Sequence, residues 1–179
     1  MQRGFEIVNR YANQGLNLPY RTTQRSAGYD FECAEDFVLP SIWRHDVLHA
    51  FKRLRQRQPL TTEELAAGNR VMKPYLVPTG IKAYMQPDEV LLLANRSSNP
   101  LKHGLILPNG VGVIDADYYN NEKNEGEIFV QLVNVSLHDV TIKKGQRIAQ
   151  GIFMPFRLAD AEQAPQQQRT GGFGSSDQQ

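Results

Sequence analysis

The sequence predicts an all-β, jelly-roll-like barrel with a helical insertion at about residues 41–73 and a flexible C-terminal tail. From Tyr75 onward, apolar segments rich in β-branched residues alternate with Gly, Pro, Asn and Asp. Turn signals at such short intervals are typical of a sandwich or barrel rather than of βαβ units. Residues 41–73 instead carry apolar side chains at helical spacing, and beyond Phe156 the composition turns polar.

Short, partly alternating segments predict the strands. Residues 4–8 and 28–39 are apolar stretches broken by polar turns. The later strands are expected within 76–85, 90–97, 103–119, 126–136 and 140–156.

Two helices are expected in the insertion. Ser41 is suited to cap a first helix that runs to about Gln58. Thr61 and Glu64 have capping-box spacing for a second helix that runs to about Asn69. The apolar stripe of the first helix is expected to pack on the barrel, and it consists of Ile42, Val47, Leu48, Phe51 and Leu54.

Two further features of the insertion have an ordinary and a functional interpretation. Its basic cluster is typical of a solvated helix face, but an acidic or regulatory protein partner stays open. His45 and His49 have a spacing that suits zinc, yet no third ligand is evident near them. The basic cluster consists of Lys52, Arg53, Arg55 and Arg57.

The composition is that of an ordinary globular protein. The chain has 179 residues and a formal net charge of +1, so no global field points to nucleic acid or a membrane. Cys33 is the only cysteine, which excludes an internal disulfide framework. The N-terminus lacks the apolar core of a signal peptide, and no apolar run has the length of a membrane span. We expect a barrel domain over 1–158, a mobile arm over 159–179 and a cytoplasmic location.

Five segments contain more polar and glycine detail than a β scaffold needs. They are Ala27–Asp30, Arg96–Gly104, Asn109–Tyr118, Gly145–Gln150 and Arg169–Ser176. Together, and in this order, they resemble the five motifs of the trimeric dUTP diphosphatase (dUTPase) family. The resemblance covers about residues 20–39 and 76–176. It implies hydrolysis of dUTP to dUMP and pyrophosphate with Mg²⁺, by a homotrimer whose active sites are shared between subunits.

The segment Asn109–Tyr118 is expected to bind the nucleoside. Gly110 and Gly112 permit a tight hairpin whose backbone can approach a flat base closely. By resemblance, Asn109 and the backbone of Gly112, Val113 and Ile114 read uracil. The Tyr118 ring packs under the deoxyribose, where a 2′-hydroxyl does not fit.

Two carboxylates are expected to act at the triphosphate. By resemblance, Asp115 holds the attacking water in line with the α-phosphorus, and Asp30 reaches Mg²⁺ through a water molecule. Mg²⁺ gives up its waters reluctantly, which suits such an indirect contact. Asp117 would lie on the same face of a strand as Asp115, and we give it no catalytic role.

The remaining candidate residues are polar groups suited to phosphate and a glycine-rich tail suited to close over the nucleotide. Hydroxyls, amides and guanidinium groups donate hydrogen bonds to phosphate, and Phe173 offers a ring that can stack on the base. By resemblance, the phosphate contacts come from Arg96, Ser97, Ser98 and Gln150, and the closing tail supplies Arg169, Gly171, Gly172, Phe173, Gly174 and Ser175.

One departure and two alternatives accompany the resemblance. Residues 119–124 interrupt the turn that follows the tyrosine in the family, and we expect them to bulge at the surface. A dCTP deaminase shares the fold and a similar Arg-Ser-Ser segment, but Gln131 stands where that reaction needs a glutamate. A non-catalytic nucleotide sensor would keep the pocket without hydrolysis.

Overall fold

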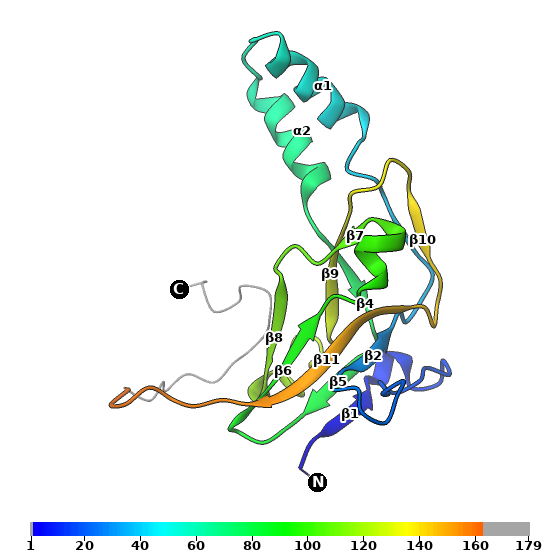
Figure 1. The fold of residues 1–179 in the computed structure, drawn as a ribbon, viewed down its shortest axis with the longest axis vertical. Coiled ribbons are helices and arrows are strands. Elements are labelled where there is room, and N and C mark those ends of the chain that lie inside the picture. The colour runs from blue at the N-terminus through cyan, green and yellow to red at the C-terminus, as the bar shows by residue number, and fades with distance from the viewer. Residues whose placement is uncertain (1, 163–179) are drawn as a thin grey trace.

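The structure, a computed structural model, describes residues 2–162, and it shows strands gathered in one body from which two helices project (Figure 1). The predicted all-β class with a helical insertion is confirmed. The strands are β1 Gly4–Ile7, β2 Tyr29–Glu32, β3 Phe37–Leu39, β4 Tyr75–Pro78, β5 Ile81–Tyr84, β6 Glu89–Ala94, β7 Leu105–Ile106, β8 Val111–Asp115, β9 Phe129–Asn134, β10 Val140–Ile142 and β11 Arg147–Pro155. The helices are α1 His45–Arg55 and α2 Thr62–Met72, with short helical turns at Asn9–Tyr11, Asn99–His103 and Ala116–Tyr118.

The strands pair antiparallel in four small sheets. The largest has the order β2-β11-β6-β8, and a second has the order β4-β9-β7. β1 pairs with β5, and β3 pairs with β10. β11 is the long strand that joins β2 to β6, so segments near both ends of the chain meet in one sheet (Figure 1).

One apolar core holds these sheets together. Burial of a large apolar side chain stabilises a fold by about 1.5–3 kcal/mol. Alternate residues of β6 point inward, so Leu91 and Leu93 are buried, and Phe31 of β2 lies in the same cluster. The core also contains Leu39, Leu105, Ile128, Leu132, Ile142 and Ile148.

The two helices form a hairpin that stands away from the strands (Figure 1). α2 begins as predicted, because the Thr61 hydroxyl accepts from the Glu64 N–H and the Glu64 carboxylate accepts from the Thr61 N–H. That backbone hydrogen bond lowers the pKa of the Glu64 carboxyl. α2 ends at Met72, slightly later than predicted, and α1 ends at Arg55, slightly earlier.

Two predictions for α1 are wrong. Ser41 does not cap it: its hydroxyl donates to the Ser136 carbonyl at 2.5 Å, and the helix begins at His45 without a side-chain cap. The apolar stripe does not pack on the barrel either. Phe51 is 57% exposed and Leu48 52%, whereas Val47 is buried. The face of α1 that carries His49 and Arg53 lies against α2, so Leu48, Phe51 and Leu54 of the stripe are left exposed.

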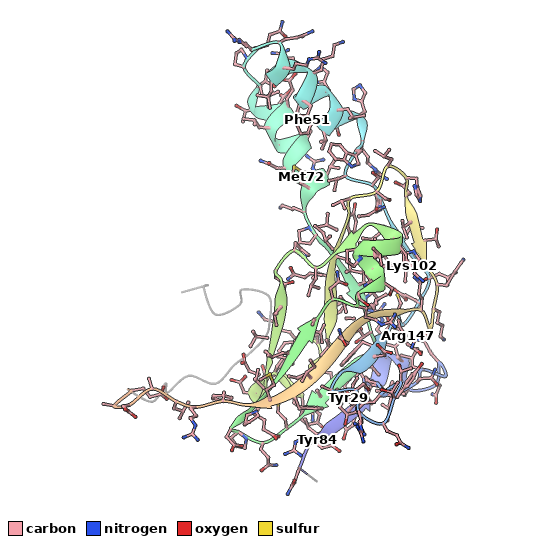
Figure 2. All side chains as sticks on the ribbon, in the orientation of Figure 1. Tyr29, Phe51, Met72, Tyr84, Lys102 and Arg147 are labelled. Carbon is pink, nitrogen blue, oxygen red and sulfur yellow. The ribbon has the colours of Figure 1, made fainter. Side chains whose placement is uncertain are left out.

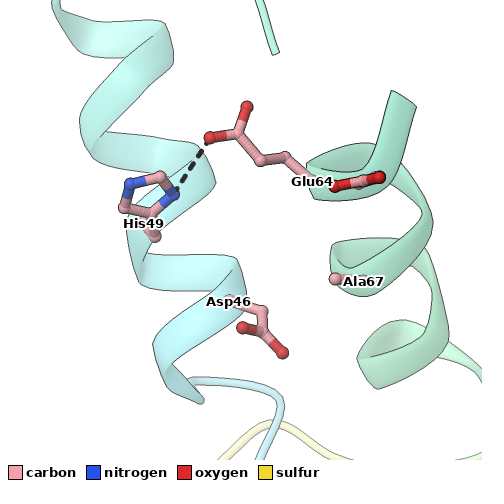
Figure 3. A pocket seen from close by; sticks show the side chains of 5 residues that line it. Asp46, His49, Glu64 and Ala67 are labelled. Atoms are coloured by element: carbon pink, nitrogen blue, oxygen red, sulfur yellow. Dashed lines mark ion pairs between the residues drawn. The ribbon is translucent and has the colours of Figure 1, made fainter. Parts of the chain in front are cut away.

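Polar residues line the space between the helices (Figure 3). His49 of α1 lies 3.6 Å from the Glu64 carboxylate of α2, and Asp46 and Ala67 line the same groove. Within residues 2–162 there is no cluster of three or more His, Cys, Asp or Glu side chains that could hold a metal ion. The rings of His45 and His49 stack on each other with their centroids 5.9 Å apart.

The segment at residues 119–124 is more firmly held than a surface bulge requires. Lys82 of β5 donates to Asn120 and to the Glu125 carboxylate, both at 2.7 Å, and Asn121 is buried. The hydroxyl of Tyr119 donates to Glu6 of β1. In the described part of the chain, no helix has the length and apolar character that a membrane crossing needs.

Candidate active site

The register of the largest sheet aligns residues from three predicted motifs in one row. Asp30 of β2 pairs with Gln150 of β11, Gln150 pairs with Ala94 of β6, and Ala94 pairs with Val111 of β8. The Arg96–Ser98 segment leaves β6 just beyond this row. Three segments that are far apart in sequence, around residues 30, 96 and 150, thus meet at one end of the sheet.

Asp30 is the centre of this end of the sheet. Its Oδ1 accepts from Arg96 Nε at 2.8 Å, and its Oδ2 accepts from Arg147 Nη1 at 3.0 Å and from the Thr22 hydroxyl at 2.7 Å. The Asp30 side chain is 9% exposed, against 22% for Arg96 and 36% for Arg147. A buried carboxylate therefore holds two more exposed guanidinium groups, and Figure 2 shows Arg147 on the barrel.

This geometry disfavours the predicted metal contact of Asp30. A carboxylate has about four acceptor positions, and three donors already point at Asp30. Two of these donors are cations, which repel a metal ion. A water-mediated contact with Mg²⁺ would have only the one remaining acceptor position, next to two cations.

The loop that carries Ser97 and Ser98 is fixed by a residue that the sequence did not single out. Asn99 is 2% exposed, and its side-chain amide donates to the Ile148 carbonyl and to Asn95 Oδ1, both at 2.7 Å. Ser97 is exposed and Ser98 is half-buried. Asn99 thus ties the serine loop to β11 and leaves the hydroxyl of Ser97 accessible to a ligand.

Gln150 is held against the same loop. Its side-chain amide donates to the Asn95 carbonyl at 3.1 Å. A Cβ on Gly28 would lie 2.5 Å from Gln150 Oε1 and 3.2 Å from Gln150 Cβ. Gly28 is therefore needed for the close approach between the first and fourth motifs.

The predicted base-binding hairpin is an exposed turn followed by β8. Gly110 has a φ of +69°, which a residue with a Cβ rarely adopts, and its N–H donates to the Leu107 carbonyl. A Cβ on Gly112 would meet Leu93 Cβ at 3.1 Å, with Asn109 Nδ2 beyond it. Val113 is 58% exposed and Ile114 packs against the core, so β8 has one face open to a ligand.

Asp115 is the last residue of β8, and the chain then enters a helical turn at Ala116–Tyr118. The expectation that Asp117 continues the strand on the face of Asp115 is wrong for this reason. Tyr118 is 4% exposed, and its hydroxyl donates to the Glu127 carbonyl at 2.9 Å. Burial raises the pKa of the neighbouring Glu127 carboxyl, against the hydrogen bond from the Gly80 N–H.

Within one chain, Asp115 is remote from the arginine cluster. Asp115 pairs with Val90, four residues along β6 from Ala94, and β8 is separated from β2 by two strands. Strands lie about 4.8 Å apart and rise about 3.3 Å per residue, so Asp115 and Asp30 are roughly 20 Å apart. The candidate residues of the tail, Arg169 to Ser175, lie outside the described residues.

Comparison with known proteins decides the family. A sequence model of dUTPase matches residues 60–177. The chain is 47% identical over 175 residues to a deoxyuridine 5′-triphosphate nucleotidohydrolase of Lactococcus lactis, and the match covers 97% of each chain. The chain belongs to the dUTPase family. The predicted membership in this family of enzymes is confirmed.

Solved dUTPases show the same fold. The crystal structure of the dUTPase from Streptococcus mutans matches with a TM-score of 0.69 and 42% identity, over 88% of this chain and 99% of that one. The dUTPase from phage φ11 of S. aureus matches with a TM-score of 0.62 over 92% of this chain and 96% of that one, at 16% identity. The second likeness supports the fold alone.

Proposed function

We propose that this dUTPase-family protein hydrolyses dUTP to dUMP and pyrophosphate. Family membership supports the substrate. The observation that carries the proposal is that the two guanidinium groups held by Asp30 and the loop with the exposed Ser97 lie at one end of the sheet. A triphosphate needs such a set of cations and donors to offset the charge on its oxygens.

Asp115 is the residue proposed to act at the reacting centre. An aspartate with an ordinary pKa of about 3.9 is a weak base, so its main service is to hold a water molecule in line with the α-phosphorus. Positioning of this kind lowers a barrier by as much as ~7–11 kcal/mol in ideal cases. Its place at the end of β8, where it pairs with Val90 of β6, supports this role.

The exposed face of β8 is proposed to select the base and sugar. The backbone of Gly112, Val113 and Ile114, with the amide of Asn109, reads the edge of uracil. A wrong base leaves buried polar groups unpaired at a cost of about 1–3 kcal/mol each. Tyr118 closes the site under the deoxyribose, and its hydrogen bond to Glu127 supports a fixed ring that a 2′-hydroxyl would meet.

The separation of the two clusters supports the proposal that the active site is shared between the subunits of a homotrimer. One nucleotide cannot contact Asp115 and the arginine cluster of the same chain across roughly 20 Å unless its base and phosphates span the sheet. A neighbouring subunit that supplies Asp115 removes the difficulty. The tail over 159–179, with Arg169, Gly171, Gly172, Phe173, Gly174 and Ser175, is proposed to close over the nucleotide.

Magnesium is proposed only as the counter-ion of the substrate triphosphate. Hard oxygen ligands of the phosphates, together with waters, suit this ion. The protein's part is to bind the phosphates, orient the base and exclude bulk water, apart from the attacking water, from the scissile bond. We also propose that the protein is located in the cytoplasm.

A protein partner for the α1–α2 hairpin stays a prediction. What supports it is the exposed stripe of Leu48, Phe51 and Leu54 beside basic side chains. A photo-crosslinker placed at Phe51 should trap one acidic protein in cells, and Glu63 of α2 offers a control position. Equal labelling from both positions would reject a specific partner.

Incubation with dUTP and with dCTP tests the proposed reaction. We expect pyrophosphate and dUMP from dUTP, and no ammonia from dCTP, because Gln131 of β9 cannot serve as the general base of a deaminase. Asp115→Asn should abolish hydrolysis and still bind dUTP. A protein that binds dUTP but releases no pyrophosphate would instead be a nucleotide sensor.

A further inference from the structure

We propose that Asp30 is a positioning residue that holds Arg96 and Arg147, and that Arg147 is a second phosphate-binding arginine of the site. The inference rests on the proposed function and deepens it. It replaces the expected contact between Asp30 and a metal ion with a contact between Asp30 and two guanidinium groups.

The hydrogen bonds around Asp30 show how the two arginines are aimed. Arg96 uses Nε and Arg147 uses Nη1 to reach opposite oxygens of one carboxylate, at 2.8 and 3.0 Å. Each guanidinium has five N–H donors, so each keeps donors for a phosphate. Arg147 also donates to the Thr22 hydroxyl at 3.2 Å, which fixes the orientation of its plane.

The exposure of the three side chains indicates where an anion would bind. Asp30 lies deepest, and Arg147 is the most exposed of the three. Thr22, which bonds both Asp30 and Arg147, also lines an open groove of about 590 Å³ formed by Pro19 to Gln24 and Tyr29. An anion that enters from solvent therefore meets the guanidinium groups before it meets the carboxylate.

The charges favour the same assignment. Two guanidinium groups so close together repel each other, and the shared carboxylate offsets this repulsion. The cluster keeps a net charge of +1, which attracts a triphosphate and disfavours a metal cation at Asp30. Asn99 and the sheet register hold the serine loop on β11, so the two arginines and Ser97 keep fixed positions before a ligand arrives.

Binding measurements without metal test the role of Arg147. The non-hydrolysable analogue dUpNHpp and deoxyuridine are titrated by calorimetry in EDTA. We expect Arg147→Gln to weaken the analogue roughly tenfold to a hundredfold, because a charge-assisted hydrogen bond to phosphate is lost. Deoxyuridine binding should stay within about twofold of wild type, since deoxyuridine has no phosphate.

Arg21→Gln is the matched control. Arg21 lines the same groove and donates to the Gln24 and Ser26 carbonyls, but it does not contact Asp30. Its substitution should change analogue binding by less than about twofold. Equal effects of Arg147→Gln and Arg21→Gln would overturn the assignment of Arg147.

The variant Asp30→Asn distinguishes a positioning residue from a metal ligand. The sign of its effect on the affinity for dUpNHpp in EDTA differs between the two roles. Removing one negative charge should by itself tighten the binding of a metal-free triphosphate. Weaker binding of dUpNHpp in EDTA, with deoxyuridine unaffected, can therefore come only from lost positioning of the arginines. Unchanged or tighter binding in EDTA, with a loss confined to Mg²⁺, would overturn the proposal and restore the metal contact.

A double-mutant cycle and a spectroscopic readout complete the test. In a protein that already carries Arg96→Gln and Arg147→Gln, Asp30→Asn should have no further effect on analogue binding. The Nε–Hε NMR signal of Arg96 should be protected in wild type and lose protection in Asp30→Asn. If wild type hydrolyses dUTP while the cycle shows independent effects, the inference fails and the proposed function stands. If wild type leaves dUTP intact, the proposed function fails first.

Discussion

Mixed trimers offer a direct test of a site shared between subunits. Asp115→Asn removes the carboxylate at the end of β8. Arg96→Gln removes one guanidinium of the arginine cluster, which lies at the opposite end of the sheet. The register places these groups roughly 20 Å apart within one chain. Each variant alone should be inactive, because every site in its homotrimer carries the same lesion.

Hybrids of the two variants should regain activity. When the variants are unfolded, mixed in equal amounts and refolded, a site works only if its Asp115 comes from one variant and its arginine cluster from the other. Random assembly gives about a quarter of the wild-type activity, and the activity should fall on either side of the equal mixture. The activity of each mixture is measured as the rate of pyrophosphate release. An inactive mixture at every ratio, with intact hybrid trimers, would refute the shared site.

Further predictions concern the local packing and the stability. Gly28→Ala should raise the KM for dUTP, because the new Cβ displaces the Gln150 side chain; an unchanged KM would exclude Gln150 from the site. Lys82→Met should cost about 1–3 kcal/mol of unfolding free energy at neutral pH, measured by urea denaturation. The Lys82 hydrogen bond lowers the pKa of the Glu125 carboxyl, so this contribution is full above an unfolded pKa of about 4.3 and is lost as pH falls through the lower folded value. The difference between wild type and Lys82→Met should shrink below about pH 4, and a constant difference would contradict the pairing. Phe51→Ser should lower the unfolding free energy by no more than about 1.5 kcal/mol, since its ring is 57% exposed and its aromatic contact is with Trp43; a larger loss would mean that the stripe is packed.

The sequence predicted those features that local chemistry controls. The Thr61–Glu64 spacing predicted the start of α2 correctly, because both halves of a capping box lie within one turn. The recurrent turns and β-branched segments predicted the all-β class, because each strand carries its own alternation. The order and spacing of the five motifs predicted the family.

Features that depend on distant partners were missed. Ser41 bonds Ser136, which is remote in sequence, so no local pattern could show that it does not cap α1. The stripe of α1 has the same periodicity whether it covers a barrel or faces solvent. Arg147 lies in the fourth motif, but the sequence assigns it no role, because its contact with Asp30 depends on the pairing of β11 with β2. A basic residue three positions before Gln150 was the only signal that could have drawn attention to it.

Hydrolysis in water enriched in heavy oxygen tests the central claim most directly. If Asp115 holds a water molecule in line with the α-phosphorus, the heavy oxygen appears in dUMP and the pyrophosphate carries none, as read by phosphorus NMR and mass spectrometry. Asp115→Asn should give neither labelled product. Label in the pyrophosphate would place the attack on a different phosphorus atom and contradict the account.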